Sequence, residues 1–412
     1  MTRRKKGNLA WSHMRKLGLF RVVLALVVGS VGAWLAFALA VSGVTRYRAP
    51  EAALAFMPGD SVALAARADE ILVSNQGKPS PLTKRMANDA VRQQAVNPTA
   101  VRLLGYEADA AGNGRAALAL INLATRLSRR EAGAQLWLIE HHVLANDARA
   151  ALAHYDVLLR TTAGAESLLF PRLTSALEDE PIRRALRPYL RGDSPWIGSF
   201  LWYAISNSQN VTGVVNLIVE SGGFPVRYTS SDHQRGLLDR LVREGRFQEA
   251  LVVYRLVPGA DLSRLSNPAF QDSDRDGRFG AMGWRIEEGP DAGGGIGSQT
   301  GNKSLGLSVF ANAASTQRVA SRLLYLRPGP YRLATALSHI DESPGAYVDF
   351  QLRCPVIGQT VPITRFADSP RRRIAPFTVP AGCFVQFLDI VISGGNGQSG
   401  FTATLSEVTI SR

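Results

Sequence analysis

The sequence GRAALAL at residues 114–120 returns as ARAALAH at residues 148–154, and this recurrence decides how the middle of the chain is organised. Ala117-Leu118 lies 34 residues before Ala151-Leu152, and Ala185-Leu186 follows at the same interval. A fixed interval of this length is typical of stacked helix pairs, because each pair has an apolar face that only its neighbour can cover. Small alanines at the crossings let the paired helices approach. The segment 97–258 is therefore predicted to be a helical array.

A fourth copy, REGRFQEALVVYRLV at residues 243–257, has Gly245 in the turn and Ala250 on the packing face. The segment 97–258 thus resembles the tetratricopeptide repeat family, whose period is 34 residues. The resemblance implies an α-solenoid whose surface binds a protein partner. The chain departs from the family pattern, since the usual Trp and Gly-Tyr positions are mostly missing and YLRGDSPWIGSFLWYAISNS at residues 189–208 breaks the register. A generic helical bundle remains the alternative.

Towards the N-terminus, VVLALVVGSVGAWLAFALAVSGV at residues 22–44 contains no charged residue. As a helix rising about 1.5 Å per residue, it can cross a hydrocarbon layer roughly 30 Å thick. Residues 1–21 form a basic tail without acidic side chains, so the positive-inside rule places the tail in the cytoplasm and the bulk of the chain in the periplasm. We predict a single-pass protein of the bacterial inner membrane. The alternative is a signal peptide cleaved after Ala40, because ALA at residues 38–40 has the small residues required.

The formal net charge of +13 comes largely from this tail, which carries seven basic side chains. Residues 45–258 carry 25 basic and 21 acidic side chains, and residues 259–412 carry 15 and 13. Both parts are near neutral, which argues against a nucleic-acid-binding face.

The segment 45–96 joins the apolar segment to the helical array. Its alanines recur at helical spacings between Pro50, Pro58 and the sequence GKPSPL at residues 77–82. Because proline and glycine commonly interrupt helices, we expect a short helix with a linker on each side.

From residue 262 the apolar period changes from that of helices to that of strands. Val348, Phe350, Leu352 and Cys354 alternate with polar residues, and CFVQFLDIVIS from Cys383 is apolar on both faces, like a central strand. Turn-like stretches such as PDAGGGIGSQTG at residues 290–301 separate roughly seven to nine such runs. Residues 262–412 are therefore predicted to form an antiparallel β-sandwich of the jelly-roll type, and the whole chain is a multidomain protein of α plus β class.

Three motifs of this segment can be compared with a known type of domain. NPAF at residues 267–270, GW at 283–284 after a variable loop, and LRPGPYRL at 326–333 ahead of a long strand look like the carbohydrate-binding-module type of jelly roll. This resemblance covers roughly residues 262–412. The whole arrangement resembles membrane proteins found in bacterial exopolysaccharide gene clusters, which implies polysaccharide as a further partner.

Glycan binding usually requires exposed aromatic rings that stack on sugars beside polar side chains. The candidates in the predicted sandwich are Tyr325, Tyr331, Tyr347 and Gln351. Packing in the core or at a sheet edge is the alternative role for each of them.

The chain has two cysteines, Cys354 and Cys383. On neighbouring strands in an oxidising compartment they are expected to form a disulfide, with two reduced buried thiols as the alternative. A zinc site is not expected, because two cysteines without nearby histidines cannot supply four ligands.

The sequence DSDRDG at residues 272–277 places Asp272, Asp274 and Asp276 at alternate positions before a glycine, as a calcium loop begins. Position 12 of such a loop should be a bidentate glutamate but is Gly283, and two arginines lie among the would-be ligands. We therefore favour a solvated turn ahead of a buried Trp284 over a calcium site, and we predict no metal or cofactor.

The sequence contains no HExxH motif and no dinucleotide or Walker glycine spacing. We predict a non-enzymatic periplasmic adaptor in cell-envelope or exopolysaccharide assembly. One alternative is a glycan-binding protein that acts through the jelly roll, with the helices as a spacer. Another is a hydrolase or lyase, which would need two carboxylates about 5–10 Å apart across a cleft.

Overall fold

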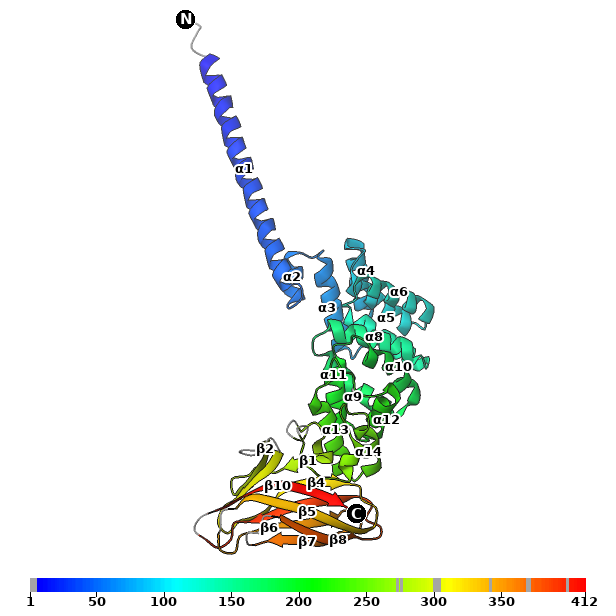
Figure 1. Ribbon diagram of the computed structural model, residues 1–412. Helices are drawn as coiled ribbons and strands as arrows, with labels where there is room; N and C mark the ends of the chain where they lie inside the picture. The colour runs from blue at the N-terminus through cyan, green and yellow to red at the C-terminus, as the bar shows by residue number, and fades with distance from the viewer. Residues whose placement is uncertain are drawn as a thin grey trace. The chain divides into compact units, whose positions relative to one another are not determined.

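The computed structural model describes residues 6–271, 274, 277–298, 305–340, 343–367, 372–397 and 400–412, with side chains from residue 22 onward except at 338–340. The chain divides into two compact units, Met1–Ala165 and Glu166–Arg412 (Figure 1). Along the described residues, fourteen α-helices precede two antiparallel five-stranded sheets. The predicted fold class, α plus β with one apolar helix and a β-sandwich, is confirmed.

The first unit begins with the long helix α1 (Lys6–Thr45), in which Val22–Thr45 is apolar enough to be a single membrane span or a signal sequence. The next helix, α2 (Pro50–Phe56), packs against the end of α1. The rings of Phe37 and Phe56 meet edge to face with centroids 5.8 Å apart, and Ala38 is fully buried. One side of the last turns of α1 is therefore covered by the segment that follows it, while Phe37 and Leu39 remain exposed.

The segment 45–96 contains three helices where the sequence led us to expect one helix with linkers: α2, α3 (Ser61–Ser74) and α4 (Pro81–Gln93). The difference has a local cause. Pro50 and Pro81 occupy first-turn positions of α2 and α4, where the missing backbone N–H has no helical partner to lose. Asp60 caps α3 by accepting hydrogen bonds from the backbone N–H groups of its first turn. The prolines begin helices here instead of separating them.

Two helix pairs complete the first unit: α5 (Pro98–Ala110) with α6 (Gly114–Leu127), and α7 (Ala132–Leu144) with α8 (Ala148–Thr161). The recurring Ala117 and Ala151 lie in the second helix of each pair and are buried. Gly105 shows how close the crossing is, because a Cβ there would lie 2.8 Å from Ile121. Small residues at the crossings thus explain the repeated motif, while membership of the tetratricopeptide family stays a prediction.

The second unit opens with further helices, in which the later copies of the motif place Leu186 and Ala250 in the core. Arg183 and Glu220 join two of these helices through a 3.0 Å ion pair. The helices are α9 (Ala165–Ser175), α10 (Glu180–Arg191), α11 (Ile197–Asn207), α12 (Thr212–Ser221), α13 (Ser231–Arg243) and α14 (Phe247–Tyr254).

The β-sandwich consists of two sheets that lie face to face (Figure 1). Sheet A has the strand order β1-β4-β9-β6-β7, and sheet B has the order β2-β3-β10-β5-β8. Their apolar sides form one core, in which Val348, Phe350 and Leu352 of β6 point inward as the alternation predicted. The strands are β1 (Trp284–Ile286), β2 (Ala292–Ser298), β3 (Leu305–Ala311), β4 (Thr316–Leu324), β5 (Gly329–Ile340), β6 (Tyr347–Cys354), β7 (Gln359–Phe366), β8 (Arg372–Val379), β9 (Gln386–Ser393) and β10 (Phe401–Ser411).

The glycine-rich stretch that the sequence suggested was a turn contains β2, an edge strand of sheet B. Its glycines allow close approach to β3, because a Cβ on Gly294 would lie 2.8 Å from the carbonyl oxygen of Ser308. The ring of Phe310 lies close to Gly293 in the same way. Glycine therefore marks close backbone approach here instead of a chain reversal.

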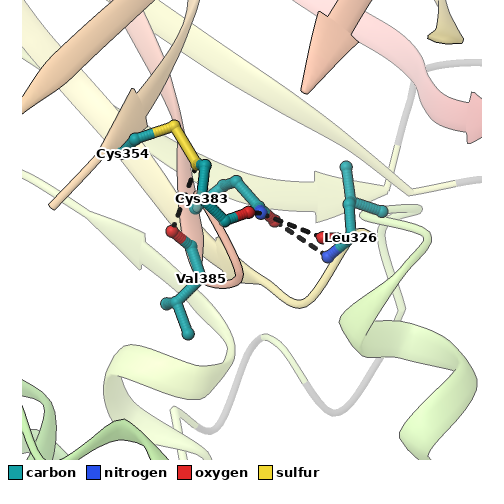
Figure 2. The surroundings of a disulfide bond; sticks show 5 residues. Leu326, Cys354, Cys383 and Val385 are labelled. Carbon is teal, nitrogen blue, oxygen red and sulfur yellow. Dashed lines mark hydrogen bonds between the residues drawn. A yellow bond between two sulfur atoms is a disulfide. The ribbon is translucent and has the colours of Figure 1, made fainter. Parts of the chain in front are cut away.

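The predicted disulfide between Cys354 and Cys383 is present, and Figure 2 shows its surroundings. It joins the end of β6 to the turn before β9, with Cα atoms 5.6 Å apart, and both cysteines are fully buried. Next to it, Gln386 donates a 3.0 Å hydrogen bond to the carbonyl of Leu326 and accepts a 2.8 Å bond from the N–H of Leu326. This end of the sandwich is therefore held both covalently and by a buried amide.

Candidate functional site

Asp274 does not lie in a solvated turn, and that interpretation of the aspartate triplet is wrong for this residue. Its side chain is 0% exposed, and Oδ1 accepts hydrogen bonds from Arg264 Nη2 at 2.7 Å and Arg322 Nη1 at 3.2 Å. Its Oδ2 accepts a 2.9 Å bond from the backbone N–H of Gln271. The oxygens that a calcium ion would need are therefore occupied by protein donors.

The other two aspartates of the triplet, Asp272 and Asp276, lie outside the described residues. Among the described residues, no group of three or more His, Cys, Asp or Glu side chains is placed to hold a metal ion. The buried Arg322 has its pKa lowered by desolvation, which the Asp274 carboxylate opposes.

Trp284 begins β1 and is 4% exposed, as the sequence predicted for a core residue. Its indole Nε1 donates a 2.8 Å hydrogen bond to the carbonyl of Pro268, so the expected buried partner is present. The guanidinium of Arg322 lies over the same ring at 5.7 Å.

Two of the candidate tyrosines are used for packing. Tyr325 donates a 2.7 Å hydrogen bond to the carbonyl of Phe247 in α14, and burial raises the pKa of its phenol. Tyr331 stacks on Phe377 with ring centroids 5.8 Å apart and packs against the sandwich core. Neither residue lies beside Tyr347 and Gln351 on one surface.

The other two candidates lie on the outward side of β6, because cross-strand partners and every second residue of a strand share one face. We call this outward side of sheet A the arginine–aspartate face. It consists of Ser321, Tyr347, Asp349, Gln351, Arg353, Arg365, Phe387 and Asp389.

Asp389 of β9 forms the first ionic centre of this face. Arg353 donates from Nε to Oδ2 at 2.7 Å and from Nη2 to Oδ1 at 3.3 Å, which is a two-pronged contact. Ser321 adds a 2.6 Å hydrogen bond from its hydroxyl to Oδ1. The same guanidinium lies over the ring of Phe387 at 4.4 Å.

Asp349 of β6 forms the second centre. Its Oδ2 accepts hydrogen bonds from Gln351 Nε2 at 2.9 Å and from Arg365 Nη2 at 3.2 Å. Arg365 also lies 4.0 Å over the ring of Tyr347. Each arginine of the face therefore covers one carboxylate and one aromatic ring.

This layering decides what the face presents to solvent. The side chains of Asp349 and Asp389 are each 7% exposed, whereas those of Arg353 and Arg365 are 35% and 55% exposed. The outer layer is therefore positively charged and rich in N–H donors, while both aromatic rings are covered. Such a surface suits hydroxyl and carboxylate groups better than an uncharged ring that stacks.

Sequence patterns had not singled out four functional residues of this face: Asp349, Arg353, Arg365 and Asp389. The sequence does indicate that two of them face outward. In YVDFQLRC, residues 347–354, Asp349 and Arg353 alternate with the apolar residues that face the core. Asp389 was a single carboxylate in the apolar run of β9. Nothing local shows that β6 and β9 pair and bring these residues together.

No protein-family model and no curated protein sequence matches this chain. Among solved structures, TmCBM61 in complex with β-1,4-galactotriose is 9% identical, with a TM-score of 0.23, over 31% of this chain and 88% of that one. A structure of carbohydrate-binding modules from the β-sandwich superfamily is 15% identical, with a TM-score of 0.24, over 32% and 58%. The Clostridium thermocellum xylanase 10B CBM22-1–GH10 modules with xylohexaose are 14% identical, with a TM-score of 0.22, over 32% and 26%. The chain thus spans less than two thirds of the last two, and likeness at this level carries no functional argument.

Proposed function

We propose that the protein is a non-enzymatic adaptor, held in the bacterial inner membrane by α1, whose β-sandwich binds an acidic polysaccharide during cell-envelope or exopolysaccharide assembly. One observation carries this proposal. On the arginine–aspartate face the guanidinium groups of Arg353 and Arg365 lie over the buried carboxylates of Asp389 and Asp349.

Each guanidinium has five N–H donors, and the contacts within the face use only some of them. The remaining donors can bond the carboxylates and hydroxyls of a uronic-acid polymer. Gln351 uses Nε2 in its bond to Asp349, so its carbonyl oxygen can accept from a sugar hydroxyl. The buried aspartates hold the arginines in position, so little side-chain entropy is lost on binding.

Two observations support an uncleaved anchor and a periplasmic bulk. Ala38 is fully buried, and the neighbouring Phe37 packs on Phe56 of α2, so cleavage after Ala40 would require this packed part of the chain to open first. The Cys354–Cys383 disulfide is typical of an oxidising compartment.

The two carboxylates of the face support a binding role over catalysis. Hydrolysis of a glycoside needs one carboxyl group as acid and another as base or nucleophile. Asp349 and Asp389 are each bonded to an arginine and are each 7% exposed, so both carboxylates are already engaged by protein donors.

The adaptor role requires a protein partner on the helical surface. Four large apolar side chains on α6 and α7 are exposed, which supports a protein contact in the first unit. They are Leu123, Leu127, Val143 and Leu144.

The polysaccharide proposal is tested with the full chain in nanodiscs, by measuring binding to alginate, an acidic polymer, and to dextran, a neutral one. We expect binding that depends on Arg365 and on low salt for alginate only, with alginate binding weakened as sodium chloride rises from about 50 to about 500 mM. Arg365→Ala should reduce it several-fold. Arg372→Ala is the matched control, because Arg372 is similarly exposed and ion-paired but lies on β8 of the opposite sheet.

Equal dependence on Arg365 for both polymers, or equal losses of alginate binding in both arginine variants, would refute the proposal. For the protein partner, a photo-crosslinking residue in place of Leu144 should trap a defined envelope protein. The same residue in place of Val356, an exposed apolar position of the sandwich, should not trap it.

A further inference from the structure

The helical part of the second unit contains an open cleft that the proposed function does not use. Its cavity volume is about 670 Å³, and it lies between α9, α11, the start of α13 and the loop that precedes α13. The residues that matter for its chemistry are Glu166, Phe170, Trp202, Tyr203, Asn207 and Tyr228.

Trp202 distinguishes the cleft from an ordinary surface depression. It is 49% exposed, and its indole N–H makes no hydrogen bond within the described part of the chain. By contrast, Trp137 donates to Asp109 at 2.9 Å and Trp284 donates to Pro268 at 2.8 Å. Trp202 therefore offers both a ring surface and an unused donor.

The indole ring is held in place from one side. His233 of α13 meets it edge to face with centroids 5.6 Å apart. Gly236, about one turn further along α13, faces the ring without a side chain, and a Cβ there would be in ordinary van der Waals contact with the ring at 3.6 Å. The ring is thus oriented before any ligand arrives, which lowers the entropy lost on binding.

The polar groups around Trp202 are side-chain oxygens and hydroxyls. Glu166 lines the cleft without an ion pair among the described residues. Asn207 donates its Nδ2 to the carbonyl of Tyr203 at 2.9 Å, so its Oδ1 remains an acceptor. Ser199 and Ser206 are exposed in the lining. None of the described residues that line the cleft is a lysine or arginine, so the site does not favour anions.

We propose that this cleft binds a neutral oligosaccharide, with one sugar ring stacked on Trp202 and adjacent hydroxyls bonded to Glu166 and Asn207. Sugar hydroxyls both donate and accept, and they match this set of carboxylate, amide, hydroxyl and indole groups. The aromatic side chains among the lining residues suit the apolar face of a pyranose ring, because an aromatic side chain gives a large contact area with few rotatable bonds.

A peptide fits these observations less well. Extended peptides are commonly recognised through backbone pairing with a strand edge, and the described residues that line this cleft belong to helices and loops, with no strand among them. This proposal is independent of the acidic-polysaccharide proposal. The cleft lies in the helical part of the second unit and the arginine–aspartate face in its sandwich, and both the residues and the ligand charge differ.

The test uses the full chain in nanodiscs free of sugar-based detergent, titrated by calorimetry with cellohexaose, xylohexaose and maltohexaose. At least one should bind. Trp202→Ala should lower the affinity at least about tenfold, and Glu166→Gln and Asn207→Ala should each lower it less. Trp137→Phe, which changes another partly exposed tryptophan, and Arg365→Ala, on the arginine–aspartate face, should leave the affinity unchanged.

Saturation-transfer NMR on the unmodified protein provides a readout that needs no variant, and the bound sugar should receive magnetisation from indole protons. The inference is overturned if none of the three hexasaccharides binds, or if binding survives in Trp202→Ala. It is also overturned if a proline-rich peptide binds in a Trp202-dependent way and the sugars do not.

Discussion

Replacing Asp274 with asparagine should destabilise the second unit strongly, although the sequence around it suggests a harmless surface position. The carboxylate accepts from Arg264 at 2.7 Å and from Arg322 at 3.2 Å, with all three side chains at most 4% exposed. Hydrogen bonds to charged groups contribute about 1.5–3 kcal/mol each, and breaking a buried ion pair costs about 3–5 kcal/mol. Asparagine keeps the shape and one acceptor, so about 3 kcal/mol is expected, and Asp274→Ala should lie near 5 kcal/mol.

The assay is scanning calorimetry of the full chain in nanodiscs. The unfolding transition of the sandwich is identified as the one whose Tm changes when the disulfide is reduced. For a unit of this size, 1 kcal/mol shifts the Tm by about 2–4 °C, so a fall of roughly 6–20 °C is expected across the two variants. Asp232→Asn is the matched control. Its ion pair with Arg235 is also 2.7 Å long, but the side chains are 55% and 48% exposed, so the change should stay within about 0.5 kcal/mol.

If the Tm decreases by less than about 2 °C in both Asp274 variants, the reasoning is refuted. Such a result would mean that this carboxylate is not needed to stabilise the two buried arginines. A second comparison separates lost charge pairing from lost packing. Replacing Arg264 and Arg322 with methionine and Asp274 with leucine together removes every charge of the cluster, and it should recover most of the stability lost in Asp274→Asn.

Four further predictions concern the disulfide, calcium, topology and pH. Replacing Cys354 and Cys383 with alanine should cost the sandwich about 3–4 kcal/mol in denaturant unfolding, because the bridge closes a loop with a sequence separation of 29; a loss under about 1 kcal/mol would contradict this. Excess calcium should raise the Tm by less than about 2 °C relative to a sample with chelator, because the Asp274 carboxylate is already bonded to arginine. A calcium ion that did bind, at a hundred times its Kd, would add about 2.7 kcal/mol of stability, so a larger rise in Tm would indicate a metal site. A periplasm-active reporter fused after Arg412 should be functional on a chain of full length, and a soluble product that begins at Val41 would show cleavage instead. Burial raises the pKa of Tyr325 above its ordinary 10.0, so the unfolded chain loses this proton at a lower pH than the folded chain. The stability that the neutral phenol contributes is therefore complete below about pH 10 and falls as the pH rises beyond it. Tyr325→Phe should flatten this alkaline fall in Tm, and an unchanged slope would exclude Tyr325 as its source.

Much of the fold could be predicted because it depends on short-range periodicity. The absence of charge over residues 22–44 predicts a long apolar helix, and the alternation of Val348, Phe350 and Leu352 predicts which side of β6 faces the core. The glycines of β2 show where this reasoning fails, because glycine permits both a turn and a close strand pairing. Local sequence patterns show which backbone conformations a residue permits, and the tertiary contacts determine which of them is formed.

The candidate sites depended on contacts that leave no local mark. The sequence by itself determined that Tyr347 and Gln351 share a face, since strand residues two apart or four apart point the same way. Only the tertiary structure decided that Asp389 pairs with Arg353, because this requires β6 and β9 to be neighbours in sheet A. Asp274 shows the same division: its sequence begins a calcium loop, yet its partners lie 10 and 48 residues away. A buried charge is stabilised by an opposite charge that the fold brings within about 3 Å of it. The fold in turn is set by the burial of the apolar faces of both sheets. The residues beside the charge in the chain therefore do not reveal its partner.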